Sequence, residues 1–130
     1  MLKAIASDHF NLKDVNAMTD KLDHIQAIDK SFALTMTKAG KCSLLAVHFD
    51  IWFEAGMPNP VFFSTSPAAK PTHWKQTLFY LDTPMVVEVG DVIEGHLKAS
   101  QCVGDERHWD IEFQYKSGTS MTLRTQKYRI

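Results

Sequence analysis

Apolar and polar side chains alternate with a period of two over much of the chain after about residue 30. Successive side chains of a β-strand point to opposite faces, so this period predicts strands that bury one face and expose the other. The clearest runs are 31–37, with Phe32, Leu34 and Met36 on one face; 46–54, with Val47, Phe49, Ile51 and Phe53 on one face; and 109–116, with Trp109, Ile111, Phe113 and Tyr115 on one face. The alternation therefore predicts a sheet-rich fold.

Shorter strands are predicted at 60–65, 75–81, 85–89 and 92–100, because Pro, Gly, Asn, Asp or Ser residues bound each of them. The segment 101–108 is polar and contains a glycine, so we expect an exposed hairpin loop there. A second hairpin is predicted where 109–116 passes through a Ser117–Gly118 turn into 120–128, in which Met121 and Leu123 resume the apolar face.

Only residues 12–25 suggest a helix, with Leu12, Val15, Met18, Leu22 and Ile25 at spacings of three and four. Val, Asn, Thr and Asp are indifferent helix formers, so a twisted strand pair or a single helical turn remains an alternative. About eight short strands without βαβ alternation predict an all-β fold. We expect an antiparallel β-barrel or a barrel-like sandwich, with at most one short helix near the amino terminus.

The length of 130 residues predicts a single domain over residues 1–130, and a hydrophobic content of 45% is enough for one core. Fourteen Lys and Arg residues against 15 Asp and Glu residues give a formal charge of −1, which argues against direct nucleic acid binding. No apolar run is suited to a signal peptide or a spanning helix, so we expect no membrane association. Cys42 and Cys102 form no CxxC pattern, which indicates a cytoplasmic or nuclear protein with two small, buried thiols.

Most residues that could carry chemistry are better interpreted as surface or structural. The six histidines form no HxH, HxxxH or Cys/His cluster, so no metal site is predicted. The scattered glycines form neither a GxGxxG nor a P-loop pattern, and no GxSxG sequence marks a nucleophile. Carboxylate pairs such as Asp105 with Glu106, and Asp110 with Glu112, are expected on solvated surface.

Thr72, His73 and Trp74 stand apart, because Pro71 precedes them and Pro67 lies upstream, which should hold the loop extended at the mouth of a strand. An indole beside an imidazole on such a loop could line a pocket for a planar or cationic group. From these residues alone a structural role is favoured slightly over a functional one.

A family resemblance enters at HFDIWFE (48–54), FFSTSPAAKPTHWKQTLFYL (62–81) and GDVIEGHL (90–97). These segments, in this order, resemble the carboxy-terminal β-barrel domain of the protein arginine methyltransferases, and most closely the type I enzymes that form asymmetric dimethylarginine. The resemblance is strongest from about residue 31 to 97.

The resemblance implies a two-part enzyme that transfers a methyl group from S-adenosylmethionine to arginine side chains of proteins. A separate Rossmann-like domain would bind the cofactor and supply paired glutamates for the substrate guanidinium. His73 would hydrogen-bond an acidic residue of that domain and brace the catalytic cleft. Trp74, with Thr72 beside it, would help to wall the arginine channel.

This chain departs from the family in lacking the glycine-rich cofactor loop, the double-glutamate loop and the dimerisation arm. We therefore expect a carboxy-terminal part that binds no S-adenosylmethionine and transfers no methyl group by itself. An exposed sheet edge and apolar face would allow such a part to self-associate, but the sequence does not decide this. The alternative is a stand-alone β-barrel interaction module without catalysis. A metal or small-ligand barrel unrelated to methylation is the third interpretation.

Overall fold

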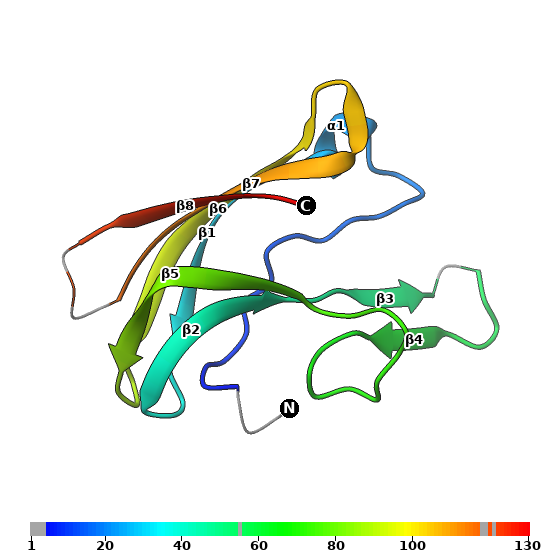
Figure 1. The fold of residues 1–130 in the computed structure, drawn as a ribbon. Helices are drawn as coiled ribbons and strands as arrows, with labels where there is room; N and C mark the ends of the chain where they lie inside the picture. Colours follow the sequence, from blue (N-terminus) through cyan, green and yellow to red (C-terminus); the bar gives the residue numbers. More distant parts are fainter. Residues whose placement is uncertain (1–4, 55, 118–119, 121) are drawn as a thin grey trace. The chain divides into compact units, whose positions relative to one another are not determined.

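The computed structural model describes residues 5–54, 56–117, 120 and 122–130. Within these residues the chain forms one four-residue helix and eight strands (Figure 1). In chain order they are α1 (Leu22–Ile25), β1 (Ala27–Thr35), β2 (Gly40–Val47), β3 (Asp50–Phe53), β4 (Val61–Ser64), β5 (Thr77–Val87), β6 (Val92–Cys102), β7 (Asp105–Ser117) and β8 (Arg124–Arg129). The all-β prediction, with about eight strands and one short helix near the amino terminus, is confirmed.

The described strands form three hydrogen-bonded sheets, with the orders β1-β6-β7-β8, β2-β5 and β3-β4, so no single sheet closes into a barrel. A barrel-like sandwich, the other predicted form, is compatible with these sheets. The described residues fall into two compact units. The first contains residue 5 and residues 42–84, and the second contains residues 6–41 and 85–130. That these units belong to a single domain stays a prediction. The four-residue helix is too short to cross a membrane.

The four-stranded sheet of the second unit is antiparallel at each of its three ladders. One of its faces carries buried side chains from β1, β6 and β7: Phe32, Ile93, Leu97, Ala99, Ile111, Phe113 and Tyr115. The alternation predicted for 31–37 and 109–116 is thus confirmed, with Trp109 half-buried within β7. This sheet provides most of the core of the second unit.

Gly95 lies opposite Phe32 in β1 and opposite Tyr115 in β7. The Phe32 ring fills the space above this glycine and packs edge-on against Phe113, with 6.3 Å between the ring centroids. A Cβ atom at position 95 would lie 2.3 Å from Phe32 Cζ and 2.5 Å from the carbonyl oxygen of Gln114. The glycine is therefore required by close packing, since the second obstacle is backbone.

The prediction of a loop over residues 101–108 is wrong. β6 continues to Cys102 and β7 begins at Asp105, so only Val103 and Gly104 form the turn. Gly104 has a φ of 80°, which suits glycine in a tight hairpin turn. The polar residues of this segment mark an exposed strand end, where the register also shifts after Gln101.

The predicted carboxy-terminal hairpin is confirmed by the antiparallel pairing of β7 with β8. Gly118 and Met121 lie outside the described residues. Leu123 was expected on the apolar face, but it precedes β8 and is 58% exposed. The inward position is taken by Gln126, whose side chain accepts a 2.6 Å hydrogen bond from the Tyr115 hydroxyl and donates one of 2.9 Å to that of Tyr128.

Residues 12–25 contain a turn and the four-residue helix α1, so the single helical turn is the alternative that the structure supports. Side chains compete here with the helical hydrogen bonds. Asp20 Oδ2 accepts from the backbone N–H of Asn16, and Asn16 Oδ1 accepts from the backbone N–H of Met18. Met18 is 87% exposed, so this segment does not bury an apolar stripe.

In the first unit, the strand expected at 46–54 is broken at His48 and Phe49 and becomes β2 and β3. Phe49 and Phe53, which were expected to face a core, are 42% and 48% exposed. The backbone N–H and C=O of Phe49 bond to Thr65 instead of continuing the strand. This expectation is therefore wrong, and the break has consequences for the site.

Strands expected separately at 75–81 and 85–89 are instead one long strand, β5, which runs through Pro84. Within the described residues β5 has a hydrogen-bonded neighbour, β2, on one side only. Proline is tolerated in an edge strand at a position where the backbone N–H would face solvent, because no acceptor on a neighbouring strand then loses a hydrogen bond.

Gly95→Ala is expected to lower the free energy of unfolding by about 1–3 kcal/mol, because the added methyl group must displace both a ring and a carbonyl group. Chemical denaturation measures this change. Ser100→Ala, at an exposed position of the same strand, is the matched control and should stay within about 0.5 kcal/mol of the wild type. Equal stability of Gly95→Ala and the wild type would contradict the packing argument.

The outer face of β7 and β8 carries an exposed, bidentate ion pair between Asp110 and Arg129, with distances of 2.7 and 3.0 Å. Hydrogen bonds from Arg129, and then from Cys102, hold the pKa of Asp110 below its usual value. A lowered folded-state pKa adds stability above the unfolded-state pKa, and this contribution is lost as the pH falls through the folded-state value. Arg129→Met should therefore lose less stability than the wild type between about pH 5 and pH 2, as followed by thermal unfolding. Identical acid dependence would contradict this assignment.

Candidate functional site

Thr72, His73 and Trp74 lie in the irregular segment between β4 and β5, within the first unit. Trp74 is 47% exposed, His73 is exposed and Thr72 is half-buried. The hydroxyl of Thr72 donates a 3.1 Å hydrogen bond to the carbonyl oxygen of Trp74, which closes the loop on itself. Both rings are thus presented at the surface, and Thr72 shapes the loop that carries them.

Trp74 belongs to an aromatic cluster that consists of Phe49, Phe63, His73 and Trp74. Its indole stacks on the Phe63 ring, with centroids 5.3 Å apart and 13° between the planes. The Phe49 ring meets Trp74 edge-on at 6.3 Å, and the His73 ring lies 4.1 Å away at a tilt of 34°. Phe63 and Phe49 therefore fix the orientation of Trp74, while nearly half of its surface stays open to a ligand.

Hydrogen bonds of Thr65 support this cluster. Its side chain is 3% exposed, and its hydroxyl accepts a 3.0 Å hydrogen bond from the N–H of Phe49 and donates one of 2.9 Å to the carbonyl oxygen of Phe49. The backbone N–H of Thr65 donates to the same carbonyl oxygen at 3.0 Å. The side chain of Gln76 donates to the carbonyl oxygen of Thr65 at 2.5 Å, which ties the end of the loop to the same point.

Sequence reasoning singled out the loop and missed Phe49, Phe63, Thr65 and Gln76. Phe49 was assigned to a core face, and the other three were read only as parts of motifs. Their motifs, FDI, FST and THWKQT, did carry the signal, since the structure brings these three segments into one cluster. The sequence pattern did not predict the break in the strand at Phe49, which turns the Phe49 ring toward Trp74.

The aromatic cluster offers a ring face and a titratable imidazole. Aromatic faces attract planar cations, and a guanidinium stacks on an indole especially well. Within the part of the chain that the structure describes, His73 has no acidic partner. The described residues also contain no group of His, Cys, Asp and Glu suited to a metal ion.

The remaining histidines mostly pair with single carboxylates. His24 lies 3.5 Å from Asp20, and His108 lies 2.6 Å from Asp105. His24, His108 and Asp105 are exposed and Asp20 is half-buried, which agrees with the surface or structural role predicted for these histidines. Asp105 and Glu106 are in β7 and not in a loop, but they are exposed as predicted.

The two cysteines are free thiols and are half-buried, so they are less buried than predicted. Desolvation raises the pKa of each thiol. At Cys102 a hydrogen bond to Asp110 raises the pKa further, because the carboxylate disfavours a thiolate. Neither thiol is therefore an activated nucleophile.

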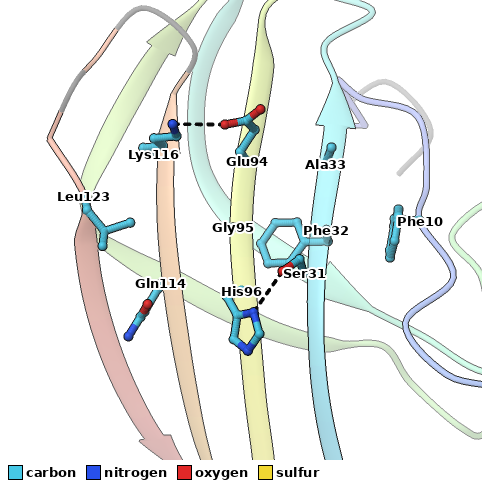
Figure 2. A pocket seen from close by; sticks show the side chains of 10 residues that line it. All are labelled: Phe10, Ser31, Phe32, Ala33, Glu94, Gly95, His96, Gln114, Lys116 and Leu123. Atoms are coloured by element: carbon cyan, nitrogen blue, oxygen red, sulfur yellow. Dashed lines mark hydrogen bonds and ion pairs between the residues drawn. The ribbon is translucent and has the colours of Figure 1, made fainter.

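A cavity of about 490 Å³ lies in the second unit, over the outer face of β1, β6 and β7. Figure 2 shows Phe10 and Leu123 at its opposite ends and His96 on its floor. His96 Nε2 lies 2.6 Å from Asp29 Oδ1, and Nδ1 lies 3.0 Å from Ser31 Oγ. This order is that of a hydrolytic triad, but Asp29 is 66% exposed whereas a triad carboxylate is buried. We interpret the arrangement as cross-strand support for the sheet.

Thr65→Val is expected to lower the free energy of unfolding by about 1–3 kcal/mol, because it removes both hydroxyl bonds to Phe49 and leaves the part-buried N–H of Phe49 without its acceptor. Thr65→Ser keeps the hydroxyl and should retain most of the stability. Urea denaturation followed by tryptophan fluorescence measures both the stability and the environment of the indoles. A stability loss in Thr65→Ser that equals or exceeds the loss in Thr65→Val would contradict the assignment of this stability to the hydroxyl group.

The family model for the arginine methyltransferase oligomerization subdomain matches residues 2–120. Protein arginine N-methyltransferase 1 of Saccharomyces cerevisiae is 35% identical over 119 residues, which cover 84% of this chain and 34% of the relative. The Chlamydomonas reinhardtii protein of the same name is 34% identical over 101 residues, covering 76% of this chain and 29% of the relative. The chain thus spans about a third of the length of these curated relatives.

Two solved structures share the fold. The Trypanosoma brucei PRMT1 enzyme-prozyme heterotetrameric complex with AdoHcy superposes with a TM-score of 0.87 at 27% identity, over 97% of this chain and 40% of that one. Arabidopsis thaliana protein arginine methyltransferase 10 gives a TM-score of 0.83 at 19% identity, over 98% of this chain and 39% of that one, which shows likeness of fold alone. With most of its length matched by the family model, the chain belongs to the arginine methyltransferase oligomerization subdomain family.

Proposed function

We propose that this chain is the substrate-side part of a protein arginine N-methyltransferase and that it contributes the Thr72–Trp74 loop to the arginine-binding cleft. The observation that carries the proposal is the indole of Trp74, which is stacked on Phe63 and yet 47% exposed. Family membership supports the proposed substrate class, because the curated relatives are protein arginine N-methyltransferases.

The chemistry of the substrate explains why an aromatic wall is useful. A guanidinium group is planar and stays protonated near neutral pH, so it must be oriented before one of its nitrogens can attack. The Trp74 face attracts the cation without forming a hydrogen bond that would occupy the attacking nitrogen. Phe49 and Phe63 keep the indole in one orientation, which limits the entropy lost on binding.

His73 acts as a positioning residue in this proposal. Its imidazole lies 4.1 Å from the Trp74 ring and is exposed, so it is available to a carboxylate of another domain. Such a pair would fix the edge of the cleft. No proton transfer by His73 is required, since the guanidinium loses its proton only after the methyl group has moved.

S-adenosylmethionine, bound by another part of the complete enzyme, would supply the electrophilic methyl group. The solved complex of the Trypanosoma brucei enzyme contains AdoHcy, the corresponding demethylated compound. The aromatic cluster does not fit the cofactor, because three aromatic rings and an imidazole offer no carboxylate for the ribose hydroxyls. We therefore propose that this chain alone neither binds the cofactor nor transfers methyl groups.

Assembly is a second candidate function, favoured by the description of the matching family as an oligomerization subdomain. The chain would then act as an interaction module, through self-association or by binding a catalytic domain. This role is compatible with the proposed role in catalysis, since a domain that lines one side of the cleft must also contact the part of the enzyme that binds the cofactor.

The test is methyl transfer to an arginine-containing protein by the intact gene product, as wild type and as His73→Ala, Trp74→Ala and Trp74→Phe. We expect both alanine variants to lose about 10²-fold in kcat/KM, because misplacement of the substrate by about 1 Å costs this much. Trp74→Phe keeps a ring face and should retain more activity than Trp74→Ala. Thermal unfolding of each variant separates loss of activity from loss of folding.

Unchanged turnover in both alanine variants would return the loop to a structural role. A complete absence of methyl transfer by the intact wild-type gene product, with the chain still associating with itself or a partner, would favour the assembly module.

A further inference from the structure

The two faces of the β3–β4 ribbon carry different side chains. In the register of this ribbon Ile51 lies opposite Phe63, and Trp52 lies opposite Phe62. Because neighbouring side chains of a strand point to opposite faces, Trp52 and Phe62 lie on the face away from Phe63 and its contact with Trp74. The aromatic cluster therefore does not use them.

Trp52 and Phe62 form a cross-strand pair that is open to solvent. Their ring centroids lie 5.1 Å apart with 38° between the planes, and the two side chains are 55% and 54% exposed. Single exposed aromatic residues are common, but a contacting pair on a two-stranded ribbon presents a broad, rigid ring surface.

Carboxylates flank this pair. The strand alternation places Asp50 on the side of Trp52, two residues before it, and Glu54 follows directly after the end of β3 at Phe53, two residues beyond Trp52. Asp50 Oδ1 is a buried atom without a hydrogen-bond partner among the described residues, and it lies 3.7 Å from His48 Nδ1. The whole side chain of Asp50 nevertheless remains 30% exposed, and Glu54 is exposed.

The charge of this region is one-sided. No lysine or arginine occurs between Lys41 and Lys70, so the ribbon carries two carboxylates and a histidine as its ionisable groups. An exposed ring surface between two carboxylates is complementary to a planar cation that can stack and form bidentate hydrogen bonds at once. A guanidinium has this shape, while the compact, strongly hydrated ammonium of lysine does not.

We propose that this ribbon face, made of Asp50, Trp52, Glu54 and Phe62, is a second arginine-binding site that holds an unreacting arginine of the protein substrate. The choice of substrate class rests on the proposed function. The site would retain a substrate with several arginines while another arginine occupies the cleft beside Trp74. A second copy of this chain is a less suitable occupant, because the cores of protein interfaces are depleted of charge and this face has a carboxylate on each side.

Peptide binding by the chain itself tests the proposal. The probes are a glycine-spaced peptide with two arginines and the same peptide with two lysines, each titrated into the chain and followed by calorimetry at low salt. We expect the arginine peptide to bind more tightly, and Trp52→Ala to weaken its binding about fivefold or more. Trp52→Phe should keep most of the affinity, and Glu54→Gln should lower it by a smaller factor.

Tyr80→Ala is the matched control, since Tyr80 is an aromatic residue of the first unit that is 65% exposed and lies on β5. It should leave peptide binding unchanged. Equal affinity for the arginine and lysine peptides, or an unchanged affinity of Trp52→Ala, would overturn the proposal. So would a chain that fails to bind the peptide but dimerises through this face, seen as a dimer that Trp52→Ala dissociates in sedimentation experiments.

Methyl transfer by the intact gene product gives a separate readout. Trp52→Ala should raise KM for a substrate with several arginines, with little change in kcat and little change for a single-arginine peptide. If the wild-type gene product transferred no methyl groups, the proposed function would fail. The peptide titration would still show whether the ribbon face binds arginine.

Discussion

One hydroxyl group organises the first unit. Thr65 is buried, and its side chain and backbone N–H together satisfy both backbone groups of Phe49. A chain that would otherwise continue as one strand from β2 into β3 is interrupted at this point, and the ring of Phe49 turns toward Trp74. These hydrogen bonds join two residues that are 16 positions apart in the chain. They fix the position of the aromatic cluster, and therefore of the Trp74 ring that is proposed to line the arginine-binding cleft.

The period of two was enough to predict the all-β fold and the buried face of the four-stranded sheet, because Phe32, Ile111 and Phe113 alternate with polar or small residues. The same rule failed at Phe49, because the hydroxyl of Thr65 accepts a hydrogen bond from the Phe49 N–H and donates one to the Phe49 carbonyl oxygen. It also failed at the 101–108 segment, where exposed polar residues belong to the projecting ends of two strands and not to a loop. Composition indicates exposure in such a hairpin, but not whether the backbone is paired.

For the candidate site, the sequence indicated which loop to consider and did not indicate what supports it. Thr72, His73 and Trp74 are adjacent in the chain, so their proximity needed no tertiary information. Phe63 and Phe49 reach Trp74 only through the register of β3 with β4 and the break before β3, neither of which alternation encodes. The hydrogen bonds of His96 to Asp29 and Ser31 escaped prediction for a related reason, since they depend on the pairing of β1 with β6, strands that are far apart in the sequence.

The ribbon of β3 and β4 is only two strands wide, yet each of its faces has a distinct composition. This sets an unusual limit on how the segment can change during evolution. An insertion or deletion within either strand would shift the register by one residue and exchange the inward and outward side chains of that strand. Length variation in this family should therefore concentrate in the connection between Phe53 and Val61, while the strands themselves vary by substitution alone.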